Sequence, residues 1–386
     1  MDVSESIKYI GVNDHKIDLF EGQFAVPLGM AYNSYVIMDE KIAVMDSVDE
    51  DFGDQWLKNL KEALGNKKPD YLVVQHMEMD HSANIMWFME TFPEAKIIAS
   101  KMAFTMMKSY FGTDFADRQI PAAEGTSISL GKHTLNFIAA PNVHWPEVIM
   151  TYESFEKVLF TADAFGKFGA NDVEDPEGWE CEARRYYFGI VGKFGANVQT
   201  VLKKLSAFEV DTICPLHGPV LKENISHYID LYNIWSSYGV ESEGAVIAYT
   251  SVYGDTAVAA QKLAQLLIDK GLPKVSVCDL AREDFHECIE DAFRYGTLVL
   301  ATTTYNGGIF PKMKEFIENL IERNYQNRRV AFIENGAWAP AAAKQMQTLL
   351  EGCKNITFAQ NKVTIKIAVN DDVNAQIEKL AEELAE

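Results

Sequence analysis

The stretch His76-Met77-Glu78-Met79-Asp80-His81 places four side chains that can bind a metal ion within six residues. It directly follows Tyr71 to Gln75, a short apolar run after Pro69-Asp70 that predicts a buried β-strand. Loops at the end of a buried strand are a common place for functional groups. A cluster of this kind arises rarely by chance, so the stretch predicts a metal site held by a sheet.

Three further candidate ligands each follow an apolar segment that predicts another strand. These are His144, Asp163 and His217. A lone histidine or aspartate in such a place is usually an ordinary polar residue. Because the upstream cluster already predicts a metal site, we interpret these three residues as further ligands of it. Together the seven ligands are too many for one tetrahedral site, and a carboxylate can bridge two ions. We therefore predict two metal ions, with Asp163 as the bridge because it stands alone between the other ligands.

The ligand types limit which metal the site prefers. Imidazole with carboxylate suits iron, zinc or manganese, and the absence of thiolate disfavours copper(I) and iron–sulfur clusters. The five cysteines are scattered and form no Cys-x-x-Cys pair. They predict neither a disulfide framework nor a cysteine-ligated metal, and we expect them to be reduced.

Paired strand signals dominate the first 240 residues. Hairpins are predicted at Tyr35 to Val44, at Ile128 to Pro141, and for Val148 to Tyr152 with Val158 to Ala162. Ser82 is a favoured N-cap and predicts a helix from Ala83 to Phe92. Hairpins mixed with helices suggest two sheets with helices outside them.

The order of predicted strands and helices changes after Ser236 to Gly244. This polar, glycine-bearing stretch is the best linker candidate. Strands and helices then alternate regularly, which predicts a doubly wound parallel sheet. The expected strands are Ala245 to Tyr249, Val275 to Leu280, Leu298 to Thr302, Val330 to Ile333 and a fifth within residues 356–368. The chain is therefore expected to divide into domains at 1–243 and 244–386.

The composition excludes several classes of partner. The 386 residues carry a formal net charge of −21, with −17 on the first 245 residues. Such an acidic surface repels phosphate backbones and anionic lipid, so we expect no nucleic acid and no membrane as partner. No apolar run is long enough to span a membrane, and the N-terminus lacks a signal-peptide pattern, so we expect a cytoplasmic protein.

The seven ligands resemble those of the metallo-β-lactamase fold, an αββα sandwich. Hydrolases of that fold typically carry His-x-His-x-Asp-His and bind zinc, whereas Glu78 here replaces the second histidine. A hard anionic oxygen in place of an imidazole shifts preference toward iron. That replacement is the hallmark of the flavodiiron proteins, or A-type flavoproteins, which reduce O2 or NO. The resemblance implies an α/β chain in which the sandwich precedes a flavodoxin-like domain.

Three loops of the second part resemble the FMN-binding loops of flavodoxins, and all follow predicted parallel strands. The first resembles the phosphate loop: Thr250, Ser251, Val252, Tyr253, Gly254, Asp255 and Thr256. The second resembles the loop beside the flavin ring: Thr303, Thr304, Tyr305, Asn306 and Gly307. The third occupies the place of the remaining flavin loop: Asn335, Gly336, Ala337 and Trp338. Two departures are Asp255, where asparagine is common, and the third loop, which usually reads Gly-Ser-Tyr-Gly-Trp-Ser.

The resemblance implies a reductase with FMN and two non-haem irons as cofactors. Rubredoxin or a reduced deazaflavin would supply electrons to FMN, and the irons would reduce O2 to water or NO to N2O. His76, Glu78 and His144 would hold one iron, Asp80, His81 and His217 the other. The segment Arg184-Arg185-Tyr186-Tyr187 would bring a tyrosine, Tyr186 or Tyr187, near the irons.

The resemblance also implies an assembly. A head-to-tail homodimer, or a dimer of dimers, would bring the FMN of one copy beside the diiron site of the other. Some relatives append a rubredoxin domain with paired Cys-x-x-Cys motifs; none occurs here, so we expect the minimal form.

Two other classes of function compete with this interpretation. One is a zinc-dependent hydrolase of the metallo-β-lactamase fold with an attached flavodoxin domain, in which the metal activates water. Glu78 argues against it, and the flavin domain would then lack a purpose. The other is an electron carrier with a vestigial metal pocket, which the intact ligand set disfavours.

Overall fold

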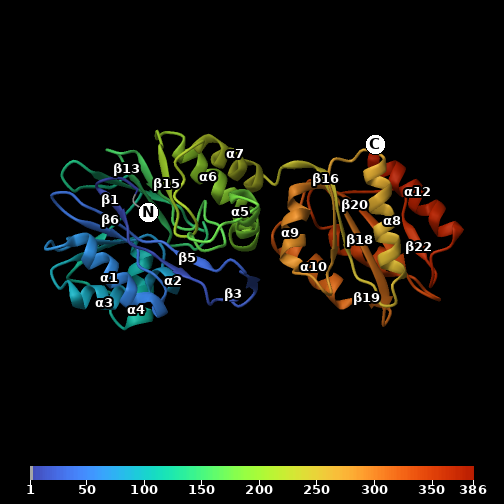
Figure 1. Ribbon diagram of the computed structural model, residues 1–386, viewed down its shortest axis with the longest axis horizontal. Helices are drawn as coiled ribbons and strands as arrows, with labels where there is room; N and C mark the ends of the chain where they lie inside the picture. The colour runs from blue at the N-terminus through green and yellow to red at the C-terminus, as the bar shows by residue number, and fades with distance from the viewer. Residues whose placement is uncertain (1–2) are drawn as a thin grey trace. The chain divides into compact units, whose positions relative to one another are not determined.

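The computed structural model describes residues 3–386 and divides into two compact units, Met1–Asn233 and Ile234–Glu386 (Figure 1). The division falls within α7 (Ile225–Ser236). The sequence-based domain boundary between residues 243 and 244 lies farther along the chain, inside β16 (Ser242–Tyr249), and stays a prediction. No helix in the described part of the chain combines the length and the apolar character needed to cross a membrane.

Two sheets form the centre of the first unit. The six-stranded sheet has the order β1 (Ile7–Tyr9), β6 (Tyr35–Ile37), β7 (Ala43–Met45), β8 (Tyr71–Val74), β9 (Lys96–Ala99) and β10 (Gln119–Pro121). The five-stranded sheet has the order β11 (Ser127–Ser129), β12 (Thr134–Ala139), β13 (Ile149–Glu153), β14 (Val158–Phe160) and β15 (Thr212–Cys214). Two short hairpin-like pairs, β2 (Val12–Asp14) with β5 (Met30–Tyr32) and β3 (Leu19–Phe20) with β4 (Phe24–Ala25), complete the strands.

The two sheets bury apolar side chains against each other and against outer helices. Between the sheets, Val73 of the first and Phe160 of the second belong to one buried cluster. On the outer face of the first sheet, Trp56 and Phe88 belong to a second cluster formed with α1 (Gly53–Leu64), α3 (Ile85–Thr91) and α4 (Lys101–Phe111). Figure 1 shows α5 (Trp179–Tyr186), α6 (Gly195–Leu205) and α7 beside the other sheet. The predicted αββα sandwich is confirmed.

One local prediction is wrong. Ser82 does not cap the helix that follows it but ends the short helix α2 (Met79–Ser82), and Asn84 stands at the N-cap of α3. The hydroxyl of Ser82 donates instead to the carbonyl oxygen of Met77, 2.9 Å away. The ligand segment therefore needs a helical turn of its own, which sequence periodicity did not separate from α3.

The second unit is a doubly wound sheet, as predicted. Parallel pairing gives the order β17 (Val275–Asp279), β16, β18 (Tyr295–Tyr305), β20 (Arg329–Asn335) and β21 (Thr357–Phe358), with β22 (Val363–Ile365) also on β20 and β19 (Gly308–Ile309) on β18. Helices α8 (Asp255–Asp269) and α12 (Asp371–Ala385) pack on one face. Figure 1 shows α9 (Phe285–Arg294) and α10 (Pro311–Glu322) on the other, and α11 (Ala342–Leu350) packs beside α10.

Two details of the second unit differ from expectation. The linker is shorter than Ser236 to Gly244, because α7 includes Ser236 and β16 already begins at Ser242. The fifth strand is split into β21 and β22, which pair with different parts of β20. The split leaves residues 366–369 beyond β22 as a separate loop at the carboxyl end of the sheet.

The buried side chain of Arg328 joins the first residues of this unit to its sheet by hydrogen bonds. Arg328 is almost fully buried, and its guanidinium donates to five backbone carbonyl oxygens: those of Tyr238, Gly239, Phe293, Gln326 and Asn327. Arginine suits this place because its planar group offers five donors in a fixed arrangement. It thereby satisfies carbonyl groups that are otherwise costly to bury.

We predict that Arg328→Met lowers the free energy of unfolding of the second unit by about 3 kcal/mol, because several carbonyl oxygens lose their donor. Urea unfolding followed by circular dichroism measures the change. Arg282→Met is the matched control: Arg282 is exposed and forms a surface ion pair with Asp279, so its loss should cost about 0.5 kcal/mol or less. Equal losses in the two variants would contradict the assignment.

Candidate metal centre and flavin pocket

The seven predicted metal ligands come from the carboxyl ends of strands in both sheets of the first unit. Those of the ligand segment follow β8 of the first sheet, and the others follow strands of the second: His144 follows β12, Asp163 follows β14 and His217 follows β15. Because β12 and β14 both pair antiparallel with β13, and β15 pairs parallel with β14, these three strands end at the same edge. The topology therefore brings the ligands together.

The first ligand set contains His76, Glu78, His144 and one oxygen of Asp163. The Nε2 atoms of His76 and His144 are 3.2 Å apart, and Oε2 of Glu78 lies 3.3 Å from the first and 3.1 Å from the second. Asp163 Oδ2 lies 3.3 Å from His76 Nε2 and 2.9 Å from His144 Nε2. Four donor atoms thus surround one point.

The second ligand set contains Asp80, His81 and His217. The two Nε2 atoms are 3.0 Å apart, and each lies 3.3 Å from Oδ2 of Asp80. The other oxygen of Asp163, Oδ1, lies 3.3 Å from Nε2 of His81 and 3.7 Å from Nε2 of His217. Asp163 therefore gives one oxygen to each set.

The donor atoms fit metal ions better than they fit one another. Both oxygens of Asp163 and both of Asp80 are buried without a hydrogen-bond donor among residues 3–386, and buried carboxylates are otherwise paired. Two imidazole Nε2 atoms 3.0 Å apart repel when each presents a lone pair, unless a proton or a cation lies between them. The arrangement suits two divalent cations.

The pKa shifts of the ligands also favour positive charge in the site. Burial lowers the pKa of the His144 imidazole, but the surrounding carboxylates outweigh this effect and raise that pKa to about 9. Despite burial, the surrounding imidazoles hold the pKa of Asp163 well below its usual range. Protons thus occupy the place of cations in the metal-free protein, and metal binding must release them.

Outer hydrogen bonds orient two of the imidazoles. Nδ1 of His217 donates to the carbonyl oxygen of Ala31, 2.8 Å away, which can only accept. Nδ1 of His76 lies 2.8 Å from the buried carboxylate of Glu147, which also accepts from the backbone N–H of Met77. Both bonds leave Nε2 free to bind a metal. Sequence reasoning missed Glu147, although it lies three residues after His144.

Two predicted tyrosines lie in the same helical segment but differ in surroundings. Tyr186 is fully buried, and its ring centroid lies 5.4 Å from that of His217. Its hydroxyl has no hydrogen-bond partner in the part of the chain that the structure describes. Burial and the nearby carboxylates raise the pKa of Tyr186 well above 10, so it keeps its proton. Tyr187 packs instead against Phe188 and Tyr232. The segment continues as a π-helix, Tyr187–Val191, a feature frequent at functional sites.

A second acid that sequence reasoning missed is influenced by Glu78 of the first ligand set. Glu21 lies in the turn between β3 and β4. Although the Glu21 side chain is exposed, partial loss of its hydration and the charge of Glu78 raise the pKa of its carboxyl to about 7. No sequence motif singles out this residue, because the turn approaches the ligands only in the folded chain.

The three predicted flavin loops line one cavity of about 610 Å³ in the second unit. This volume lies within the range of small-molecule sites. The lining includes all the predicted residues except Thr250 and Gly254, and it adds Ala339 and Ile367. Thr250 is buried, and its hydroxyl forms a hydrogen bond of 2.6 Å with the hydroxyl of Thr302. The backbone N–H of Gly254 donates to the hydroxyl of Ser251.

The cavity supplies what FMN needs. Tyr305 and Trp338 offer aromatic faces for the flavin ring. Hydroxyls of Ser251 and Thr256 lie at the start of α8, where a phosphate is favoured. Asp255 would repel a phosphate if its carboxylate faced the site. One of its oxygens instead accepts a hydrogen bond from the backbone N–H of Val369, 3.0 Å away. That carboxylate is therefore engaged away from the phosphate site.

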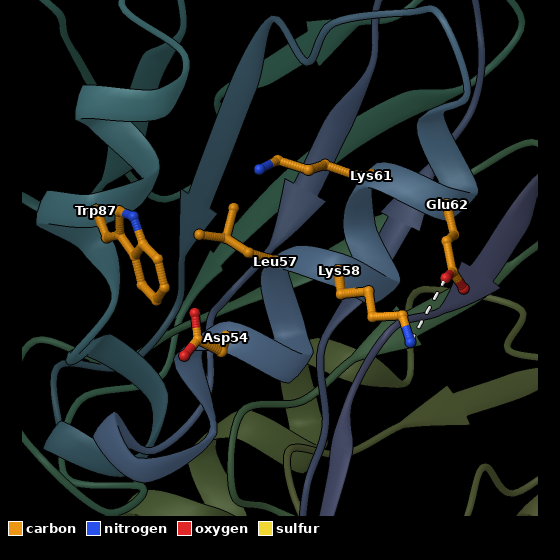
Figure 2. A pocket seen from close by; sticks show the side chains of 6 residues that line it. All are labelled: Asp54, Leu57, Lys58, Lys61, Glu62 and Trp87. Atoms are coloured by element: carbon orange, nitrogen blue, oxygen red, sulfur yellow. Dashed lines mark ion pairs between the residues drawn. The ribbon is translucent and has the colours of Figure 1, made fainter.

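A separate hollow in the first unit carries none of the predicted residues. Figure 2 shows Leu57 of α1 facing Trp87 of α3, with Asp54 between them and the Lys58–Glu62 ion pair pointing away. The charged side chains here are exposed surface groups of the helices. The hollow offers no buried polar group and needs no functional explanation.

Comparison with known proteins finds a family match in each part of the chain. The sequence matches the ODP family beta lactamase over residues 30–218 and a flavodoxin domain over residues 246–363. A nitric oxide reductase of Moorella thermoacetica is 30% identical over 374 residues, covering 94% of this chain and 92% of its own. An anaerobic nitric oxide reductase flavorubredoxin of Vibrio vulnificus is 28% identical, covering 90% and 72%.

A solved structure, the rubredoxin oxygen:oxidoreductase of Desulfovibrio gigas, matches with a TM-score of 0.92. It is 23% identical and covers 100% of this chain and 97% of its own, so it supports the fold. A binuclear centre in one unit and a flavin cavity in the other define a two-domain flavoprotein oxidoreductase. The chain belongs to the flavodiiron protein family, and its cofactors are FMN and a pair of non-haem irons.

We predict that Glu147→Gln weakens iron binding by about 10- to 100-fold, because the bond that orients and polarises His76 loses its charge. Titration of the iron-loaded protein with a chelator measures the loss. Glu153→Gln is a matched control, because Glu153 is also fully buried and contacts a histidine, His133 at 3.1 Å, outside the ligand sets. Iron retention equal to wild type in Glu147→Gln would contradict the role of Glu147.

Proposed function

We propose that this protein reduces O2 to water or NO to N2O at its two irons, with electrons that reach them through FMN. The observation that carries the proposal is the pair of ligand sets joined by Asp163, one of which contains Glu78. Its carboxylate oxygen is a harder ligand than the imidazole that zinc hydrolases use there and favours iron. The names of the Moorella and Vibrio relatives support NO as a substrate, and that of the Desulfovibrio structure supports O2.

We assign His76, Glu78 and His144 to one iron, and Asp80, His81 and His217 to the other, with Asp163 bridging. When bound, the irons would take up the diatomic gas and supply electrons to it. The protein holds the ligands in place through Glu147 and Ala31, and the surrounding buried side chains keep bulk water away. The hydroxyl of Tyr186 is a protonated donor with no other partner, so it is free to donate to the bound gas.

The electron donor and the assembly belong to the same proposal. Rubredoxin or a reduced deazaflavin would deliver electrons to FMN in the cytoplasm. A head-to-tail homodimer, alone or as a dimer of dimers, would place the FMN of one copy beside the irons of the other. A monomer that stays fully active at high dilution would overturn the dimer.

One preparation tests the function. Iron, zinc and FMN are measured per chain, and consumption of O2 and of NO is then followed with a chemically reduced donor. Two irons, one FMN and rapid consumption of a gas are expected. Two zinc ions with no gas consumption would overturn the proposal and favour the alternative, a hydrolase of the metallo-β-lactamase fold.

We predict that Tyr186→Phe lowers kcat for gas reduction about tenfold, as expected for the loss of one hydrogen bond worth about 1.4 kcal/mol, with iron content unchanged. Stopped-flow or electrode measurements of gas consumption give kcat and KM separately. Tyr325→Phe is the control, because Tyr325 is also buried with an unpartnered hydroxyl but lies in the flavin unit. A loss seen in Tyr187→Phe and not in Tyr186→Phe would reverse the choice of tyrosine.

A further inference from the structure

Ile367 is an apolar side chain at the flavin cavity that no flavin motif includes. It lies in the loop between β22 and α12, lines the cavity, and is 64% exposed. Its φ angle is +77°, and the backbone N–H of Ala368 donates to the carbonyl oxygen of Lys366 at 3.1 Å. Ile367 is therefore the central residue of a three-residue turn of the rare left-handed type.

This backbone is unfavourable for a β-branched residue, because the left-handed region crowds the side chain against the backbone. Residues in such conformations persist only where the surroundings hold them, and they concentrate at ligand sites. Here the carboxamide of Asn335 holds the turn from both sides. Its Oδ1 accepts from the N–H of Ile367, and its Nδ2 donates to the carbonyl oxygen of Ile367, both at 3.3 Å.

The same loop is tied to the phosphate loop. Asp255 accepts from the backbone N–H of Val369 at 3.0 Å, and Nδ2 of Asn335 also lies 3.4 Å from the hydroxyl of Thr256. The turn at Ile367 is thus fixed by side chains from two of the three flavin loops. These bonds explain why an isoleucine is held open to solvent at the cavity and not folded away from it.

The chemistry of the exposed side chain indicates which part of the flavin it meets. FMN offers one large apolar surface, the isoalloxazine ring, whereas its ribityl chain and phosphate are polar. A fixed apolar side chain gains by covering the ring and gains nothing from the phosphate. We propose that Ile367 is a fourth flavin-binding element, which packs on the isoalloxazine ring and is held in its strained turn by Asn335 for that purpose.

Flavin binding by the full-length protein, freed of its cofactor, tests the proposal independently of gas reduction. FMN and riboflavin are titrated separately and binding is read from quenching of flavin fluorescence. We expect Ile367→Ala to weaken both ligands by the same factor, about tenfold, because both carry the ring. Ile268→Ala is the matched control: Ile268 is 50% exposed near the far end of α8, and its variant should bind both ligands as wild type does.

A second variant tests the strain. Ile367→Gly removes the side chain and also suits the left-handed backbone, so flavin binding should weaken as in Ile367→Ala. The flavin-free glycine variant should nevertheless unfold about 2 °C higher than the alanine variant.

Three outcomes would overturn the proposal. Wild-type affinity in both Ile367 variants would exclude a contact with the flavin. Weaker binding of FMN with unchanged riboflavin binding would show that the turn acts on the phosphate loop and not on the ring. A glycine variant no more stable than the alanine variant would show that the turn is not strained.

Discussion

The carboxylate of Asp163 is the point on which the metal unit depends, because it serves two sets of imidazoles at once. Each of its oxygens lies between 2.9 and 3.7 Å from two Nε2 atoms, in a place closed to water. A buried carboxylate surrounded by imidazoles is stable only with positive charge beside it, whether protons or metal ions. The sandwich fold meets this demand by ending β8, β12, β14 and β15 at one place, so that ligands far apart in sequence converge.

The strand ends position the ligands only coarsely, and the second layer of contacts fixes their direction. The carbonyl oxygen of Ala31 accepts a hydrogen bond from Nδ1 of His217, and the carboxylate of Glu147 accepts one from Nδ1 of His76. Nε2 is therefore the atom of each imidazole that remains for a metal. Among the described residues, His81 has no such partner for its buried Nδ1. A histidine without an outer hydrogen bond is held less firmly, so His81 is the ligand that the protein constrains least.

Residues that follow a recognisable local pattern were predicted from the sequence, whereas residues whose role depends on tertiary contacts were missed. The ligand segment after β8 and the three flavin loops were recognisable because each directly follows an apolar strand. The helix predicted after Ser82 is present as α3, but its N-cap was assigned wrongly, because a capping residue cannot be told from a helix end when two short helices adjoin. Glu147 and Ile367 could not be assigned, since their partners, His76 and Asn335, lie far away in the chain.

The flavin cavity and the metal centre differ in the charged side chains that they place around a cofactor. The residues that line the flavin cavity include no lysine or arginine, and the one acid among them turns toward a backbone N–H. A flavin bound there would find no cationic side chain among these residues to pair with a negative charge on its ring. At the metal centre, imidazoles that bind a metal through Nε2 are neutral, and the carboxylates of Glu78, Asp80 and Asp163 would offset most of the charge of two divalent ions. The ligands of this site therefore both require cations and compensate most of the charge that the cations bring.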